Sequence, residues 1–172
     1  EMPKTMKQLG LVQFFSWFAL FSMWVFTTPA VAVHVYGADI HDTSSQLYQD
    51  AGNWVGIIFG VYNVVSAIYA FFFLPKLAGY FGRKNIHAIS LALGGLSFIS
   101  IFFIKTPELL LLPMLGIGIA WGSILAMPYA ILAGSLPAKK MGVYMGLFNF
   151  FITLPQIVNG VCLLSMIGKS GF

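Results

Sequence analysis

The sequence predicts an all-α polytopic membrane protein with five transmembrane helices. Only 8% of its 172 residues are charged and 59% are hydrophobic, whereas about 25% of the residues of ordinary soluble domains are charged. The charges group together and leave five long runs without Asp, Glu, Lys or Arg: 8–38, 51–75, 85–104, 109–138 and 141–168. A bilayer core about 30 Å thick takes about 20 apolar residues as a helix, so each run can cross it. This composition excludes a soluble globular domain, a disordered chain and a nucleic-acid-binding protein.

The first span is expected over about 9–35. It is too long for the hydrophobic part of a signal peptide, which is about 7–15 residues, and no small-residue cleavage site follows it. The polar loop after it carries only acidic charges, those of Asp39, Asp42 and Asp50. We therefore interpret this first run as a membrane helix followed by a loop.

The second span is expected over about 52–74, ending before Pro75, and a short loop at 75–85 follows. The third span is expected over about 86–104, the fourth over about 109–134 and the fifth over about 142–167. Backbone groups in lipid must pair within their own segment, so all five spans should be helical.

The positive charges predict the orientation of the chain. Lys and Arg accumulate in loops on the cytoplasmic side of a membrane. The N-terminal segment and the loops at 75–85 and 135–141 hold most of them: Lys4, Lys7, Lys76, Arg83, Lys84, Lys139 and Lys140. The other side holds Lys105 and Lys169 beside four acidic residues. We expect an integral protein of the plasma (inner) membrane with a cytoplasmic N-terminus. The odd number of spans and the first residue, Glu1, favour a fragment of a larger protein.

Small residues and prolines lie inside the spans. Three pairs of glycines are spaced one helical turn apart, which lets a second helix approach closely: Gly56 and Gly60, Gly118 and Gly122, and Gly142 and Gly146. Pro29, Pro113, Pro128 and Pro155 should kink or interrupt their helices. Such helices are found in transporters, but plain helix packing accounts for them equally well.

The predicted loop after the second span contains Gly79, three further residues and then Gly82-Arg83-Lys84. This pattern resembles the loop signature of the major facilitator superfamily, in which the loop acts at the cytoplasmic gate. The acidic residue usual in the first copy of that signature is absent, which fits the second copy better. Gly82 would permit the tight turn, while Arg83 and Lys84 would anchor the loop at the anionic inner leaflet. An ordinary positively charged inner loop is the alternative.

A longer stretch of sequence, in the fourth and fifth spans, indicates a particular group within this superfamily. The succession Pro128-Tyr129-Ala130, Gly142-Val143-Tyr144-Met145-Gly146, Asn149 and Leu154-Pro155-Gln156-Ile157 resembles the tenth and eleventh helices of sucrose–proton symporters. The first span, with QFFSWFALFSMW, is similar to their seventh helix. The resemblance implies the C-terminal half of a twelve-helix transporter of the glycoside–pentoside–hexuronide cation symporter group. It implies symport of a neutral sugar, a sucrose- or maltose-like disaccharide, with alternating access.

The coupling group is expected outside this chain. A cation symporter usually needs an ionisable group within the membrane, and the five predicted spans contain no Asp, Glu, Lys or Arg. His34, His41 and His87 are interpreted as interfacial or loop residues. The proton or other cation should therefore be coupled through the missing N-terminal half, where the resemblance also places a carboxylate.

The expected contribution of this half is contact with the sugar through amides and aromatic rings. Gln13, Trp17 and Trp24 share one helical face, as do Asn149 and Gln156. The predicted substrate-binding residues are Gln13, Trp17, Trp24, Asn63, Trp121, Asn149 and Gln156. Anchoring at the membrane surface is an equal alternative for Trp17. Asn149 and Gln156 could instead bond neighbouring helices or backbone groups freed by Pro155.

Enzymatic activity is not expected, because no Ser-His, His-x-x-His or paired-carboxylate set occurs within a span. The single cysteine, Cys162, provides no metal cluster, and no cofactor or nucleic-acid partner is expected. The expected partners are a small sugar, a coupled cation and the lipid bilayer. A major facilitator carrier of another small solute, or a non-transporting membrane sensor or structural protein, remains the alternative function.

Overall fold

The computed structural model describes residues 2–136 and 140–170, with side chains described as far as Cys162. The described residues form helices without strands, and five helical segments are long and apolar enough to cross a membrane. Two units can be distinguished: unit 1 consists of Glu1–Val25 and Pro128–Phe172, and unit 2 of Phe26–Met127. The fold is therefore the all-α, five-span membrane protein that the sequence predicts.

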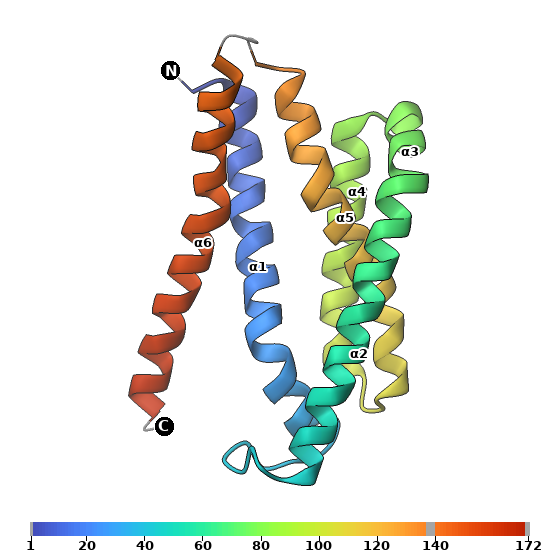
Figure 1. Cartoon of the computed structure of the whole chain (residues 1–172), viewed down its shortest axis with the longest axis vertical. Coiled ribbons are helices and arrows are strands. Elements are labelled where there is room, and N and C mark those ends of the chain that lie inside the picture. Colours follow the sequence, from blue (N-terminus) through green and yellow to red (C-terminus); the bar gives the residue numbers. More distant parts are fainter. Residues whose placement is uncertain (1, 137–139, 171–172) are drawn as a thin grey trace. The chain divides into compact units, whose positions relative to one another are not determined.

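The elements are shown in Figure 1. They are α1 (Lys4–His34), α2 (Gln46–Ile68), a π-helical turn (Tyr69–Phe73), α3 (Leu74–Phe81), α4 (Arg83–Ser100), two 3-10 turns (Ile101–Phe103 and Glu108–Leu110), α5 (Leu111–Ala133) and α6 (Met141–Ser170). The predicted spans agree with these helices in number and order. Several helices extend beyond the predicted bounds, since α1 begins at Lys4 and α2 at Gln46. Of the predicted cytoplasmic charges, Glu1 and Lys139 lie outside the described residues.

The prediction of a loop at 75–85 is wrong. The second span continues through the π-helical turn and α3, so that Gln46–Phe81 is helical throughout. Pro75 lies in the first turn of α3, where its missing N–H is tolerated. Just before it, the Leu74 N–H donates to the Tyr69 carbonyl oxygen five residues earlier, which widens the helix around the proline. The chain turns only at Gly82, whose φ of 80° is open to glycine at no steric cost.

Unit 2 is held together by close contacts of α5 with α2 and α4. A Cβ placed on Gly118 would lie 2.7 Å from the Tyr62 carbonyl oxygen, and one on Gly122 would lie 2.9 Å from that of Ser66. The contact moves four residues along α5 and four residues along α2 in the same direction, so the two helices run parallel. On α4, Gly94 meets Ala120. These small residues bring the helix backbones close, as in other membrane helix pairs.

The end of unit 2 that carries the acidic loop is closed by longer side chains. The Trp54 indole N–H donates to the Pro107 carbonyl oxygen at 2.8 Å. The ring of His34 stacks on Phe102 with centroids 5.9 Å apart. In the loop after α1, burial raises the pKa of the Tyr36 hydroxyl, and the negative charges of Asp50 and Glu108 raise it further. The loop end is therefore both packed and negatively charged.

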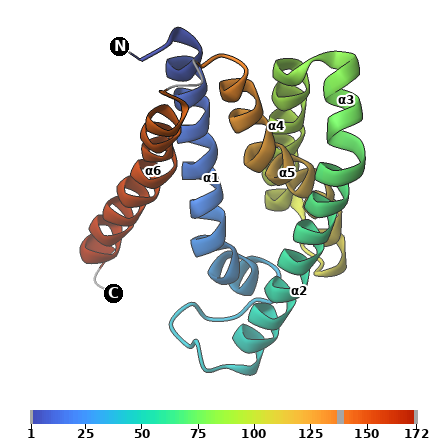
Figure 2. The ribbon, with the colours of Figure 1, turned by 45° about the horizontal axis from the view of Figure 1, so that its top comes forward.

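Unit 1 contains the first part of α1 beside α6 (Figures 1 and 2). Gly10 is so close to Phe151 that a Cβ on it would lie 2.8 Å from the ring. Eight residues further along both helices, the Asn159 amide donates to the Phe18 carbonyl oxygen at 3.3 Å. The two helices therefore run parallel, as expected for first and fifth crossings that start on the same side.

Candidate functional site

The α1 face predicted to contact the substrate contains a buried amide. Gln13 is fully buried, and neither its oxygen nor its nitrogen has a hydrogen-bond partner among the described residues. One and three turns further along, Trp17 and Trp24 meet edge to face with centroids 6.2 Å apart. A buried polar group without a partner is costly in an apolar environment. This face therefore combines an amide that can accept and donate with two aromatic rings.

The predicted α6 face carries amides that are already bonded. Asn149 is exposed, and its side-chain oxygen accepts a hydrogen bond of 2.7 Å from the Tyr129 hydroxyl. The Gln156 amide donates to the Ile152 carbonyl oxygen of its own helix at 3.0 Å. Pro155 deprives the Phe151 carbonyl oxygen, four residues earlier, of its helical N–H donor, so the bond of Gln156 to Ile152 does not offset that group. The Asn149 amide can offer its two N–H groups to a ligand, whereas Gln156 can offer one N–H beside the one that bonds Ile152.

One amide of unit 1 was not among the sequence predictions. Asn159 is buried, and it donates to the Ser22 hydroxyl as well as to the Phe18 carbonyl oxygen. Its position at the edge of the polar face of α6 provided no sign that it would meet α1. The only available signal was an amide within an apolar run, which calls for a polar partner in lipid.

Asn63 and Trp121 belong to unit 2, so they are described apart from the residues above. Asn63 is exposed, and its amide donates to the Phe59 carbonyl oxygen of the same helix at 2.8 Å. Trp121 is half-buried in α5. The buried polar cluster of unit 2 is formed by other residues.

That buried polar cluster consists of Tyr69, His87, Ser90 and Ser123. Nδ1 of His87 lies 2.8 Å from the Ser123 hydroxyl oxygen, and the Tyr69 hydroxyl lies 2.9 Å from that of Ser90. His87 is only 4% exposed. The facing helix α5 therefore covers the ring. The interpretation of His87 as an interfacial residue concerns its depth in the membrane and stays a prediction.

The predicted gate loop is reduced to the turn between α3 and α4. Gly79 lies in α3 and Gly82 forms the turn. Arg83 and Lys84 are exposed in the first turn of α4, where the positive end of the helix dipole disfavours cations. Their charges therefore do not stabilise α4 through its dipole.

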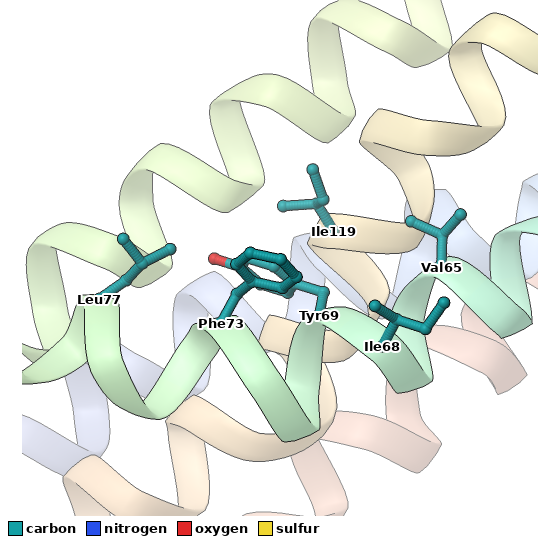
Figure 3. A pocket seen from close by; sticks show the side chains of 6 residues that line it. All are labelled: Val65, Ile68, Tyr69, Phe73, Leu77 and Ile119. Carbon is teal, nitrogen blue, oxygen red and sulfur yellow. The ribbon is translucent and has the colours of Figure 1, made fainter.

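A cavity of about 340 Å³ lies beside the π-helical turn (Figure 3). Its lining is almost wholly apolar: Val65, Ile68, Tyr69, Phe73, Leu77 and Ile119. The Tyr69 hydroxyl is already bonded to Ser90. This cavity suits hydrocarbon better than a polar solute.

The possible metal-ligating side chains are scattered in the described part of the chain. No group of three or more His, Cys, Asp or Glu residues that could hold a metal ion occurs there. The predicted substrate contacts described above are amides and indoles, which can bind ligands by hydrogen bonds and stacking.

Comparison with known proteins identifies the family. A sequence profile of the Major Facilitator Superfamily matches residues 2–159, which is most of the chain. Neither the comparison with curated proteins nor that with solved structures found a significant match. The helical fold, the five spans and the family match agree with one another. The chain therefore belongs to the Major Facilitator Superfamily, whose members are transporters of small molecules across membranes and not enzymes.

Proposed function

We propose that this chain is part of a cation-coupled symporter of a neutral sugar, a disaccharide of the sucrose or maltose type. The family match supports transport, and the resemblance to sucrose–proton symporters supports the sugar. The observation that carries the proposal is the buried Gln13 amide, which has no hydrogen-bond partner among the described residues. Sugar hydroxyls both donate and accept, so they can complete both ends of this amide.

The aromatic pair on the same helix supports the same class of substrate. The faces of Trp17 and Trp24 provide apolar area for the C–H faces of a sugar ring, and the pair is mutually fixed by edge-to-face contact. Asn149, with amide N–H groups left over from its bond to Tyr129, is a second polar contact within unit 1. Gln156 and Asn63 are weaker candidates, because their amides donate to carbonyl oxygens of their own helices. Trp121 stays a predicted substrate contact.

The coupling carboxylate is proposed to lie outside these residues, since Asp and Glu occur in the described spans only near helix ends. Transport would proceed by alternating access, with the Gly79–Lys84 segment at the cytoplasmic gate and the N-terminus in the cytoplasm.

Uptake of labelled sucrose and maltose by cells that express the full-length protein tests the proposal. We expect uptake that an inward proton gradient drives and a protonophore abolishes. Gln13→Leu should raise the half-saturating sugar concentration about tenfold, which corresponds to about 1.4 kcal/mol of lost binding. Gln8→Leu, an exposed amide of the same helix, is the matched control and should leave uptake unchanged.

Two results would contradict the proposal. Uptake of a different solute class with no sugar uptake would favour the other carrier function. Equal sugar affinity in Gln13→Leu and the unaltered protein would remove Gln13 from the site. Asn149→Ala and Gln156→Ala extend the test, because unchanged uptake in both leaves those amides structural.

A further inference from the structure

His87 is a buried titratable residue to which the proposed function assigns no role. It lies on α4, four residues after the helix begins, and it is 4% exposed. Its ring faces α5, where Ser123 is fully buried. Histidine changes its charge near neutral pH, and ionisable groups inside a membrane protein commonly mark ion or proton pathways.

The two ring nitrogens of His87 have different surroundings. Nδ1 is 2.8 Å from the Ser123 hydroxyl oxygen, whereas Nε2 is buried without a hydrogen-bond partner among the described residues. In the neutral ring one nitrogen donates and the other accepts. Depending on the tautomer, Nε2 therefore carries either an N–H without an acceptor or a lone pair without a donor.

The surrounding hydroxyls connect three helical elements. The Ser90 hydroxyl donates its single proton to the Ile86 carbonyl oxygen at 2.8 Å, so the Tyr69 hydroxyl must be the donor in the Tyr69–Ser90 bond. That bond joins the π-helical turn to α4, and the His87–Ser123 bond joins α4 to α5. The π-helical turn, α4 and α5 thus meet through two polar contacts.

No carboxylate is placed to balance a charge on His87. The part of α5 in unit 2, 111–127, contains no titratable side chain. On Gln46–Phe81 the titratable groups are Tyr48, Asp50, Tyr62, Tyr69, Lys76 and Tyr80. Asp50 is nineteen residues before Tyr69, about 28 Å along the helix, and Glu108 is fifteen residues before Ser123, about 22 Å away.

The charges near His87 on its own helix are positive. Arg83 and Lys84 are one turn before it in α4. His34, another histidine of unit 2, contacts Phe102, fifteen residues further along the same segment. A proton on His87 would therefore meet like charge on one side and no counter-charge among the helices packed around it.

We propose that His87 is a proton-binding site, and that proton binding loosens the α4–α5 contact at Ser123 so that Nε2 reaches water. The imidazolium ring donates from both nitrogens. Nδ1–H keeps Ser123 as its acceptor, but Nε2–H has none in the packed arrangement. The protonated ring and the closed contact therefore disfavour each other, which couples proton binding to a movement of two helices.

Histidine NMR and hydrogen exchange on the full-length protein in lipid nanodiscs test the proposal without any sugar. The ring of His87 is followed from about pH 8 to about pH 4, and its signal is assigned by its loss in His87→Gln. Because burial without a counter-charge favours the neutral ring, we expect the imidazolium to form toward the acid end of this range. Backbone exchange in 83–100 and 111–127, corrected for intrinsic rates, should rise at least about threefold at the lower pH.

The controls distinguish a proton site from a merely structural histidine. His87→Gln should lose the pH response of exchange, and His41→Gln, in the exposed loop, should keep it. A ring that stays neutral in the folded protein down to about pH 4 would overturn the proposal, as would equal pH responses in the unaltered protein and His87→Gln. If His87→Gln does not fold, Ser123→Ala assigns the signal, because it perturbs the ring bonded to Ser123. The outcome is independent of whether sugar uptake is observed.

Discussion

Three amides of unit 1 illustrate how differently the same side-chain chemistry is used. Gln13 has no partner among the described residues, Gln156 bonds its own helix, and Asn159 bonds α1. An amide in a membrane helix needs a partner because lipid provides none. Of the three, only Asn159 forms hydrogen bonds between two helices. Replacing each amide should therefore change the stability of the protein by a different amount.

We expect Asn159→Leu to destabilise the protein more than Gln156→Leu. Interhelical hydrogen bonds in membrane proteins contribute about 0.6 kcal/mol on average and about 1.7 kcal/mol at most. Asn159 contacts two acceptors on α1, so a loss of about 1 kcal/mol is expected. The loss in Gln156→Leu should be below about 0.5 kcal/mol, because its amide contacts only its own helix.

Reversible unfolding of the full-length protein in mixed micelles measures both free energies. Equal losses in the two variants would show that the contact of Asn159 with Phe18 and Ser22 adds no stability. Sugar affinity measured on the same samples separates this structural role from substrate contact.

At the scale of helices, the three glycine pairs are not equivalent. Gly118 and Gly122 meet the backbone of α2, whereas a Cβ on Gly56, Gly60, Gly142 or Gly146 would have no neighbour within 4 Å among the described residues. Spacing alone predicts that two glycines share a face. It does not predict which faces another helix covers.

We expect Gly118→Ala to destabilise unit 2 and Gly56→Ala to be neutral or stabilising. The added methyl on Gly118 would lie 2.7 Å from the Tyr62 carbonyl oxygen and 2.8 Å from Val65. Overpacking of this kind costs about 1–3 kcal/mol. At Gly56 the open space leaves only the better helix propensity of alanine, a gain of up to about 1 kcal/mol.

Thermal unfolding of the two variants under the same detergent conditions provides the comparison. A Gly118→Ala protein as stable as the unaltered one would mean that α2 and α5 are farther apart in the membrane than these contacts imply.

At the scale of the whole chain, the directions of the helices agree with five successive crossings. α1 and α6 run parallel in unit 1, and α5 runs parallel to α2 in unit 2. Both relations hold if successive spans alternate in direction. The orientation of the chain in the membrane remains a prediction from its positive charges.

We expect a cysteine at Tyr80, which is 86% exposed, to react only from the cytoplasmic side, and one at Ser44 only from outside. Native cysteines, Cys162 included, are replaced by serine first. A membrane-impermeant maleimide is applied to intact cells and to inverted vesicles. Labelling of Tyr80→Cys in intact cells would reverse the predicted orientation.

Charge and hydropathy along the sequence were sufficient for the fold class and the number of spans, and the glycine of the loop signature indicated the turn at Gly82. This is because a bilayer requires a minimum apolar length and paired backbone groups from every crossing. The same reasoning placed a loop after Pro75, where the π-helical turn instead carries the helix on to Phe81. A proline excludes one hydrogen bond, and the backbone can adjust around that loss in a way that residue type does not determine.

The sequence by itself determined that this is a membrane protein of five helical crossings, and its resemblance to a transporter family pointed to the family that the profile match shows. Tertiary structure decided which polar residues have partners. It left the Gln13 amide without a hydrogen-bond partner among the described residues, joined Asn159 to α1, and covered His87 with α5. The physical reason is that burial and hydrogen bonding belong to pairs of helices, and the apolar pattern of a single helix in lipid does not specify its neighbour.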